Sequence, residues 1–511
     1  MRTSFAFIWL LMLNVWLAGF AAAGEATPRP PNIVLIYADD LGWGDLGCYG
    51  ATAVKTPHSD RLAAQGLRFT SGYCASGTCT PSRFALMTGE YPWRRKGTGI
   101  LPGDAALIIA PGSATLPALL KRAGYATAAI GKWHLGLGTK QASVDWNGNV
   151  APGPLEIGFD HCFLIPATGD RTPCVYVRDH HVAGLDPADP LLVSYQEPFP
   201  GLPTGRSERA TLKMDWDFGH NEAVINGVGR IGYMKGGTAA QWKDEDMADT
   251  LAREAAAFIM AQDKTKPFFL YFATHSIHVP RVVNPRFAGI TSMGPRGDSI
   301  AEFDAQVGVV LAALDQQGLT QNTLVLLSSD NGPVLNDGYK DQAVELLGDH
   351  HPGGPYRGSK YSLFEAGTRI PFIARWPGRI TPGNSDALIS QVDLASTLAA
   401  IAGVTPAANE CPDSLVLSAT LLGEERIGRT YVIEHANGIS IRVGQWKFIP
   451  PTKSVRELKG TTTVPEPGYL YDLEHDPGER SPVDNPAKLA ELRTLLTSLT
   501  SQPGTRPGYA P

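Results

Sequence analysis

Four short apolar runs, rich in β-branched and aromatic residues, constrain the fold of this chain more than any other feature. Continuous apolar runs of this length are typical of parallel strands buried on both faces. Stretches with helical character lie between the runs, at residues 116–123, 247–262 and 299–317. The alternation predicts an α/β fold with a large mixed, mostly parallel sheet flanked by helices. The four runs cover residues 32–37, 125–130, 268–274 and 323–328.

The sequence changes character near residue 430. Turn residues there separate short strand-like runs, and residues 486–499 are predicted to form a closing helix. This pattern predicts a small C-terminal subdomain with an antiparallel sheet and one helix. We therefore expect a large domain over residues 24–425 and the subdomain over residues 426–511. The strand-like runs cover residues 431–434, 439–443, 446–449 and 469–473.

Residues 1–23 have the pattern of a secretory signal peptide. Arg2 provides a positive start, residues 5–20 are almost wholly apolar, and three alanines offer a cleavage site. The apolar run is short for a bilayer span, so we expect no stable membrane span and a periplasmic or secreted protein. Export permits disulfides, and among the cysteines other than Cys79 the nearest local guess for a pair is Cys162 with Cys174.

The overall composition is that of an ordinary globular protein, with 43% hydrophobic and 18% charged residues. The net charge of −6 gives no general attraction to nucleic acids, so we expect no nucleic-acid partner. Any binding of an anion must therefore come from a few placed arginine, lysine and histidine side chains.

Polar side chains follow all four predicted strands. Asp39 and Asp40 follow the first strand, and Asp330 and Asn331 follow the last. Ligands bind outside the carboxyl ends of strands in α/β sheets, so these residues are candidates for one site. Three carboxylates and an amide oxygen suit Ca²⁺ or Mg²⁺, whereas Zn²⁺ prefers histidine or cysteine. The other two strands are followed by Lys132 and His134 and by His275 and His278.

Residues 79–89 read Cys-Thr-Pro-Ser-Arg-Phe-Ala-Leu-Met-Thr-Gly. Pro81 suits the first turn of a helix, where its missing N–H costs nothing. Cys79 then lies at a helix N-terminus, where free N–H groups and the helix dipole favour an anion, and Arg83 lies one turn further on. A nucleophile placed there can attack a negatively charged substrate. A buried structural cysteine at the start of an ordinary helix is the alternative.

The same stretch resembles the signature of the type I, formylglycine-dependent sulfatases, which belong to the alkaline phosphatase superfamily. Five further segments are similar to sulfatase segments and follow in the family's order, over most of the chain. The resemblance implies an arylsulfatase-like hydrolase with the alkaline-phosphatase-like fold. The six segments are residues 39–45, 79–89, 131–136, 275–280, 330–332 and 357–360.

The resemblance also implies one divalent metal ion, preferably Ca²⁺ with Mg²⁺ as the alternative. The matching ligands are Asp39, Asp40, Asp330, Asn331 and the oxidised Cys79. In the family a separate maturation enzyme oxidises this cysteine to formylglycine, an aldehyde. The implied partners are therefore such an enzyme and a sulfate ester as substrate.

The remaining matches imply a catalytic mechanism. Arg83 matches the residue that supports the formylglycine, and Lys132 and Lys360 match the lysines that bind sulfate. One hydroxyl of the hydrated aldehyde attacks sulfur while His278 protonates the leaving oxygen. His134 then deprotonates the second hydroxyl, and sulfate is expelled.

Substrate contacts are expected in the loop at residues 165–171. Such a loop often contacts the substrate in the family, which makes Thr168 a candidate, and Arg171 lies in a polar loop that can line a pocket. Export and polar loops favour a sulfated carbohydrate, as a small molecule or an oligosaccharide. Two alternatives stay open: a phosphatase or phosphodiesterase of the same superfamily, and a secreted sulfoglycan-binding protein without catalysis.

Overall fold

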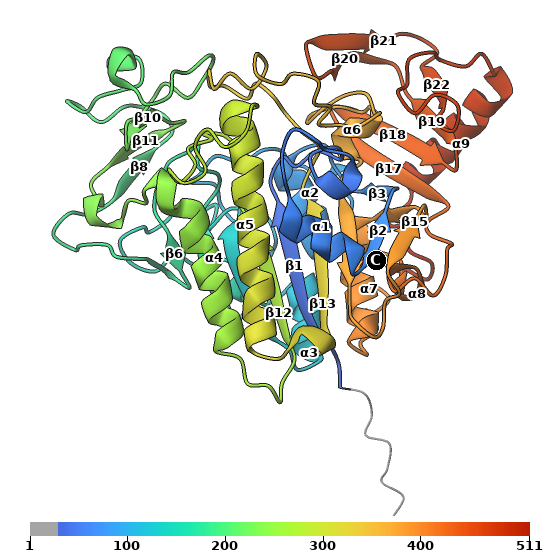
Figure 1. Ribbon diagram of the computed structural model, residues 1–511, viewed down its shortest axis with the longest axis horizontal. Coiled ribbons are helices and arrows are strands. Elements are labelled where there is room, and N and C mark those ends of the chain that lie inside the picture. The colour runs from blue at the N-terminus through green and yellow to red at the C-terminus, as the bar shows by residue number, and fades with distance from the viewer. Residues whose placement is uncertain (1–28) are drawn as a thin grey trace, which may run out of the picture.

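A computed structural model describes residues 29–511. The expected signal peptide, residues 1–23, lies outside the described residues. Figure 1 shows a central sheet with helices on both faces and a smaller sheet beside one edge. Among residues 29–511, no helix combines the length and the apolar character that crossing a membrane requires.

The central sheet is mixed and mostly parallel, as the sequence predicts. The five adjacent strands β13, β1, β12, β4 and β5 are parallel, whereas β14 and β6, which pair with β13 and β5, are antiparallel to them. The sheet order is β15 (Gly383–Ser385), β2 (Leu67–Phe69), β14 (Phe372–Arg375), β13 (Thr323–Ser329), β1 (Asn32–Ala38), β12 (Phe268–Ala273), β4 (Ala126–Lys132), β5 (His161–Ile165), β6 (Val177–Arg178) and β7 (His181–Val182).

The four predicted strands are β1, β4, β12 and β13, and their observed ends lie within two residues of the expected ones. Every residue of β1, β12 and β13 is buried, which explains their continuous apolar sequences. Strand β5 was not predicted. Its five residues stand alone in the loop-rich stretch 141–240, without a neighbouring helix pattern that would identify a strand.

Helices cover both faces of the central sheet (Figure 1). One face carries α1 (Pro57–Ala64), α4 (Asp244–Met260) and α5 (Gly294–Gln316), which pack on one another. The other carries α2 (Cys79–Thr88), α3 (Leu116–Arg122) and α7 (Leu394–Ile401). Helix α2 ends at Gly89, whose φ of 63° suits glycine and whose N–H donates to Ala85 O at 2.9 Å.

The smaller sheet is antiparallel and lies beside the α7 side of the molecule in Figure 1. Its four strands match the predicted runs, and helix α9 packs on β18 and β19. The expected domain boundary at residues 425/426 stays a prediction. The elements here are β17 (Tyr431–Ala436), β18 (Gly438–Val443), β19 (Trp446–Ile449), the separate hairpin β20 (Thr452–Arg456) and β21 (Thr461–Val464), β22 (Tyr469–Asp472) and α9 (Pro486–Ser501).

The remaining elements are short. They are β3 (Gly72–Tyr73) with β16 (Ile389–Ser390), β8 (Leu192–Ser194) with β11 (Tyr233–Lys235), β9 (Val224–Ile225) with β10 (Val228–Gly229), α6 (Glu365–Thr368) and α8 (Ser418–Leu421). Of these, the pairs β8–β11 and β9–β10 belong to the loop-rich region at the upper left of Figure 1.

A buried ionic cluster joins the smaller sheet to the large one. The Lys447 ammonium lies 3.0 Å from Glu365, 3.0 Å from Glu434 and 3.4 Å from Glu479. Arg442 approaches Glu365 at 3.4 Å. The side chains of Lys447 and the three glutamates have no exposed surface. We call these five residues the Lys447 cluster.

The expected pairing of Cys162 with Cys174 is wrong in this structure, where both thiols are free. They lie in different surroundings. Cys162 on β5 donates to Asp179 O at 3.5 Å, and Cys174 donates to Arg171 O at 3.6 Å. Their closeness in the sequence did not indicate that one thiol lies on β5 while the other lies in the loop before β6.

Candidate active site

The carboxyl ends of two neighbouring strands bring the predicted acids together. Strands β1 and β13 pair in parallel, with Ala38 opposite Ser329. Asp39 and Asp40 therefore leave the sheet beside Asp330 and its neighbour Asn331. Asp40 adopts the left-handed backbone, with φ of 64°, which turns the chain away from the strand direction.

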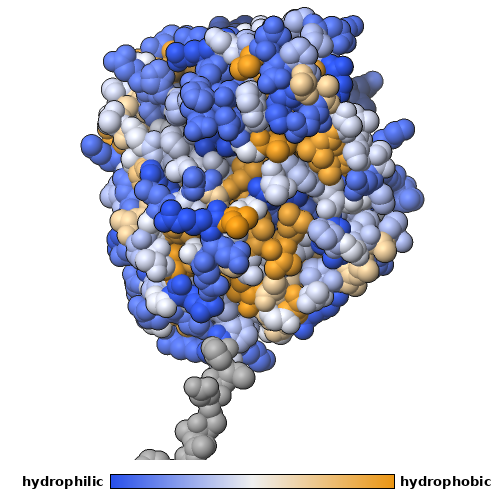
Figure 2. Space-filling model, turned by 90° about the vertical axis from the view of Figure 1, so that its right-hand side faces the viewer, coloured by the Kyte–Doolittle hydropathy of each residue, from blue (hydrophilic) through white to orange (hydrophobic). Residues whose placement is uncertain are grey.

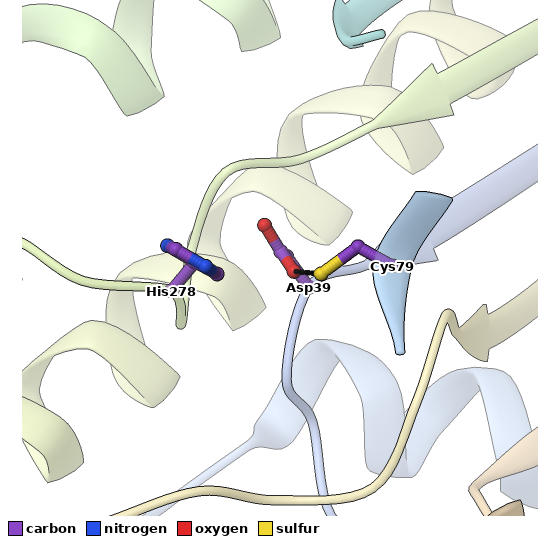
Figure 3. A group of neighbouring side chains, drawn as sticks. All are labelled: Asp39, Cys79 and His278. Carbon is purple, nitrogen blue, oxygen red and sulfur yellow. Dashed lines mark hydrogen bonds between the residues drawn. The ribbon is translucent and has the colours of Figure 1, made fainter. Parts of the chain in front are cut away.

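The Cys79 thiol lies against this acidic group. Its Sγ donates to Asp39 Oδ1 at 3.7 Å, and Figure 3 shows Cys79, Asp39 and His278 facing one another from three elements. One ligand atom from each of Asp39, Asp40, Cys79 and Asp330 lies within 4.8 Å of the others. The four side chains are buried.

The acidic group fits a hard divalent cation. Asn331 Nδ2 donates to Asp40 Oδ1 at 2.7 Å, while the buried Asn331 Oδ1 has no hydrogen-bond partner among the described residues. Burial, followed by the charge of Asp330, raises the pKa of Asp39 well above its usual range. A cation held by these oxygens would satisfy the unpaired amide oxygen and oppose that rise.

Arg83 and Lys132 supply positive charge behind the acids. Arg83 donates from Nη2 to Asp330 Oδ2 at 2.8 Å and from Nη1 to the Lys132 carbonyl at 3.0 Å. Lys132 donates to Asp39 Oδ2 at 2.5 Å. Burial would raise the pKa of Asp330, but the charges of Arg83 and Lys132 lower it overall. Both cations are buried and well fixed.

Lys360 contacts the acidic group at Asp40. Two residues that the sequence did not indicate, Asp337 and Tyr361, lie beside it. Its ammonium donates to Asp40 Oδ2 at 3.0 Å and to Asp337 Oδ2 at 2.9 Å. The Tyr361 hydroxyl donates to Asp337 Oδ1 at 3.2 Å. Asp337 lies in an Asn-Asp-Gly stretch that is typical of a turn, so its sequence gave no functional signal.

His134 has one ring nitrogen bonded and one free. Its Nε2 lies 3.0 Å from Leu101 O, which only accepts, so this nitrogen carries the proton. The buried Nδ1 then keeps its lone pair and has no hydrogen-bond partner in the described chain. Burial, followed by the charge of Lys132, lowers the pKa of His134. The ring is therefore neutral and can accept a proton at Nδ1.

His278 directs its Nε2 toward the acids. Its Nδ1 donates to Val279 O at 2.7 Å, and its Nε2 lies 4.0 Å from both Asp40 Oδ2 and Asp337 Oδ2. Burial, followed by the charge of Lys360, lowers the pKa of His278. Negative charge from a bound sulfate ester would oppose this effect.

The two predicted substrate residues lie at the edge of the site. The Thr168 hydroxyl donates to the Asp170 carboxylate, and Arg171 Nε donates to Thr168 Oγ1 at 3.2 Å. The Arg171 side chain is 17% exposed, so it faces the mouth of the site. His275 is occupied elsewhere, since its Nε2 accepts the Gly169 N–H at 2.9 Å.

The sequence model of one family, Sulfatase, matches residues 31–404 of this chain. The chain belongs to the sulfatase family. It is accordingly a sulfuric ester hydrolase, and the sulfatase family typically uses a metal ion and a formylglycine. The structure gathers all the residues that the resemblance to sulfatases implied. They are Asp39, Asp40, Cys79, Arg83, Lys132, His134, His278, Asp330, Asn331 and Lys360.

Named sulfatases align with nearly the whole chain. An N-acetylgalactosamine-6-O-sulfatase of Bacteroides thetaiotaomicron is 48% identical over 484 residues, covering 93% of this chain and 94% of that protein. Arylsulfatase A of Homo sapiens is 35% identical over 483 residues, covering 90% and 84%.

Solved structures agree with this assignment. One from work on glycosaminoglycan metabolism by Bacteroides thetaiotaomicron has a TM-score of 0.90 at 48% identity, covering 93% of this sulfatase and all of that chain. Another, solved in complex with k-i-k-neocarrahexaose, has a TM-score of 0.66 at 26% identity and covers 92% and 93%. The alkaline-phosphatase-like fold expected from the sequence is thus confirmed.

Proposed function

We propose that this sulfatase hydrolyses a sulfate ester of a carbohydrate through a formylglycine made from Cys79. The position of the thiol carries the proposal, because Sγ lies against Asp39 in the acidic group. Burial, followed by the charge of Asp330, raises the pKa of Cys79 far above its usual range, so a reactive thiolate is disfavoured. An uncharged aldehyde hydrate at this position needs no thiolate.

One metal ion, preferably Ca²⁺ with Mg²⁺ as the alternative, completes the proposed site. Asp39, Asp40, Asp330 and Asn331 would hold it, together with the oxidised side chain of residue 79. When present, the aldehyde hydrate supplies a hydroxyl nucleophile, and the ion supplies positive charge for the sulfate oxygens.

The side chains of the protein bind the sulfate group and move protons. Lys132 and Lys360 bind sulfate oxygens from two sides, where charge develops during transfer. With Nδ1–H held by the Val279 carbonyl, His278 would protonate the leaving oxygen from Nε2 as the imidazolium, a form that the negative charge of a bound sulfate ester favours. His134 accepts a proton at its free Nδ1 when sulfate is released. Arg83 keeps Asp330 ionised and in place.

The mouth of the site supports a carbohydrate substrate. Asp337 and Arg171 are the partly exposed charged groups there, with side chains 15% and 17% exposed. Hydroxyl groups of a sugar can hydrogen-bond to both in addition to their partners within the protein, whereas an apolar aryl or steroid ring cannot. The 48% identical relative is named for N-acetylgalactosamine 6-O-sulfate, which makes that ester the first substrate to test.

The proposal also covers the export and the maturation of the chain. The pattern at residues 1–23 supports export to the periplasm or beyond the cell. A separate maturation enzyme would convert Cys79, because nothing in the site oxidises a thiol. Peptide mass spectrometry tests the conversion, which replaces the –CH₂SH group with –CHO.

Activity is tested by measuring sulfate and phosphate release from matched 6-sulfated and 6-phosphorylated N-acetylgalactosamine. Sulfate release by protein that carries the converted residue is the expected result. Phosphate release alone would favour the phosphatase alternative, and an unmodified thiol with no turnover would favour the binding protein. Activity only on aryl or steroid sulfates would contradict the carbohydrate proposal.

A further inference from the structure

Lys360 lies in a loop that belongs to no helix or strand. Within residues 357–361, Gly358 and Tyr361 have left-handed backbones, with φ of 96° and 72°. Two main-chain hydrogen bonds hold the centre: Lys360 N donates to Pro333 O at 2.8 Å, and Tyr361 N donates to Gly77 O at 2.7 Å. Two more main-chain hydrogen bonds reach Arg357 and Ser359, from Ala366 N to Arg357 O at 2.8 Å and from Ser362 N to Ser359 O at 3.0 Å, and side-chain contacts hold the loop in addition.

The separate hairpin β20–β21 supplies such contacts through Glu457, the first residue after β20. Arg357 donates to Glu457 Oε1 from Nε at 3.0 Å and from Nη2 at 2.5 Å. The Ser359 hydroxyl donates to the Glu457 carbonyl at 2.9 Å. Glu457 therefore contacts the loop at two residues, one of them adjacent to Lys360.

An apolar cluster fixes the hairpin to the other end of the loop. Val455 of β20 and Val464 of β21 belong to one buried cluster with Leu363 and Phe364. The Arg357 guanidinium also lies over the Phe364 ring, 3.9 Å from its centroid. The hairpin thus holds the segment on both sides of Lys360, although it lies about 100 positions away in the sequence.

We propose that Glu457 is a positioning residue for Lys360. By fixing Arg357 and Ser359, it sets where the Lys360 ammonium lies and therefore how tightly the site binds a sulfate group. A bidentate arginine–carboxylate pair has a defined geometry, which suits this role. The Arg357 and Glu457 side chains are 26% and 20% exposed, so the pair adds little to global stability. The inference rests on the proposed sulfate-binding role of Lys360.

The test is Glu457→Gln, which keeps the shape of the side chain and removes its charge. KM for the sulfated sugar and the inhibition constant for inorganic sulfate should both rise by roughly 3- to 10-fold. The kcat per folded enzyme should fall by no more than a similar factor, because Lys360 also contacts oxygens that gain charge during transfer, and Tm should stay near the wild-type value. Glu254→Gln is the matched control, because it breaks another arginine–glutamate pair, with Arg178 at 2.6 Å, outside this loop. That control should leave all four quantities unchanged.

Lys360→Met serves as the reference variant. If it leaves the inhibition constant for sulfate unchanged, the proposed role of Lys360 fails. If Lys360→Met weakens sulfate binding while Glu457→Gln does not, the positioning role of Glu457 alone is overturned. A lower Tm for Glu457→Gln with an unchanged inhibition constant would also overturn it, because that result describes a purely structural contact.

Discussion

Two buried groups of charged side chains differ in the cations that neutralise them and in what lies beside them. In the Lys447 cluster, all three carboxyl groups lie within 3.4 Å of one ammonium, and the side chains of Lys447 and the three glutamates have no exposed surface. In the acidic group at the strand ends, by contrast, the carboxylates are shared among Lys132, Arg83 and Lys360, and the Cys79 thiol lies against Asp39. Buried oxygens without a hydrogen-bond partner in the described chain occur in both groups, at Glu434 Oε1 and Glu479 Oε1 and at Asn331 Oδ1. That group also opens to solvent beside Asp337, whose side chain is 15% exposed.

Comparing the two groups shows how a buried active site can be told from a buried ion-pair cluster with a structural role. Burial and ion pairing are common to both groups, so neither identifies chemistry by itself. A potential nucleophile and a partly exposed carboxylate distinguish the group at the strand ends from the Lys447 cluster. On the face that Figure 2 presents, a largely polar surface surrounds apolar residues that gather near its centre.

Cys79→Ser, at the strand-end group, should have the largest effect of the variants considered: it should remove activity and leave stability unchanged. A serine hydroxyl can attack once but lacks the second hydroxyl that releases sulfate, so multiple-turnover activity should fall by ~1,000-fold or more. The small change in volume should leave Tm nearly unchanged. Steady-state sulfate release and thermal unfolding measure the two effects. Normal turnover by this variant would falsify the formylglycine proposal.

Lys447→Met should act on stability instead. Removing the ammonium leaves three buried carboxyl groups without their common partner. Burial would raise the pKa of Glu365 among them, but nearby cations lower it overall, so this carboxyl is ionised and the change should cost about 3–5 kcal/mol in urea unfolding. Lys132→Met is the matched variant at the site. It should cost less stability in the presence of a divalent ion, which supplies alternative charge, yet it should abolish most activity. Equal stability losses from the two variants would contradict the comparison.

Removal of divalent ions should affect only the strand-end group. If the ion is present at about 100 times its dissociation constant, a chelator should lower the unfolding free energy by about 2.7 kcal/mol. Activity should fall with it, and both should return on addition of Ca²⁺. Asn331→Ala should show a smaller chelator effect because one oxygen ligand is lost. Lack of any chelator effect on Tm and activity in the wild type would refute the metal proposal.

Glu479→Gln should give the smallest effect, and it depends on pH. Burial raises the pKa of Glu479 to about 8, so the folded protein holds a proton that the unfolded chain loses near pH 4.5. This group therefore makes wild-type stability fall as pH rises from about 4.5 to 8. Relative to wild type, the variant should gain on the order of 2 kcal/mol between pH 5 and pH 8. A difference that stays constant across urea unfolding at both pH values would disprove this assignment.

Much of this molecule could be predicted from local sequence. The runs that form β1, β4, β12 and β13 are apolar enough to predict that these strands are buried. Polar residues follow each of them directly. Because parallel strands end at the same edge, the gathering of Asp39 with Asp330 follows from topology alone. The short signature around Cys79 then indicated the chemistry.

Other features depend on contacts that local sequence does not encode. Glu365, Glu434 and Lys447 come from three separate elements, and each looks like an ordinary exposed charge in its own segment. Asp337 reads as a turn residue until the fold places it beside Lys360. Strand β5 is identified by its pairing with β4 and β6 rather than by its sequence.

The burial of Cys79 has a consequence for timing. Only 2% of this residue is exposed, and every residue of α2 is buried, so an enzyme cannot reach the thiol in the finished fold. The proposed conversion would therefore precede closure of the sheet around it. That closure waits for distant parts of the chain, since Asp40 and Asn331 are 291 positions apart. Slow pairing of remote strands gives a newly made chain an interval in which its signature is still accessible.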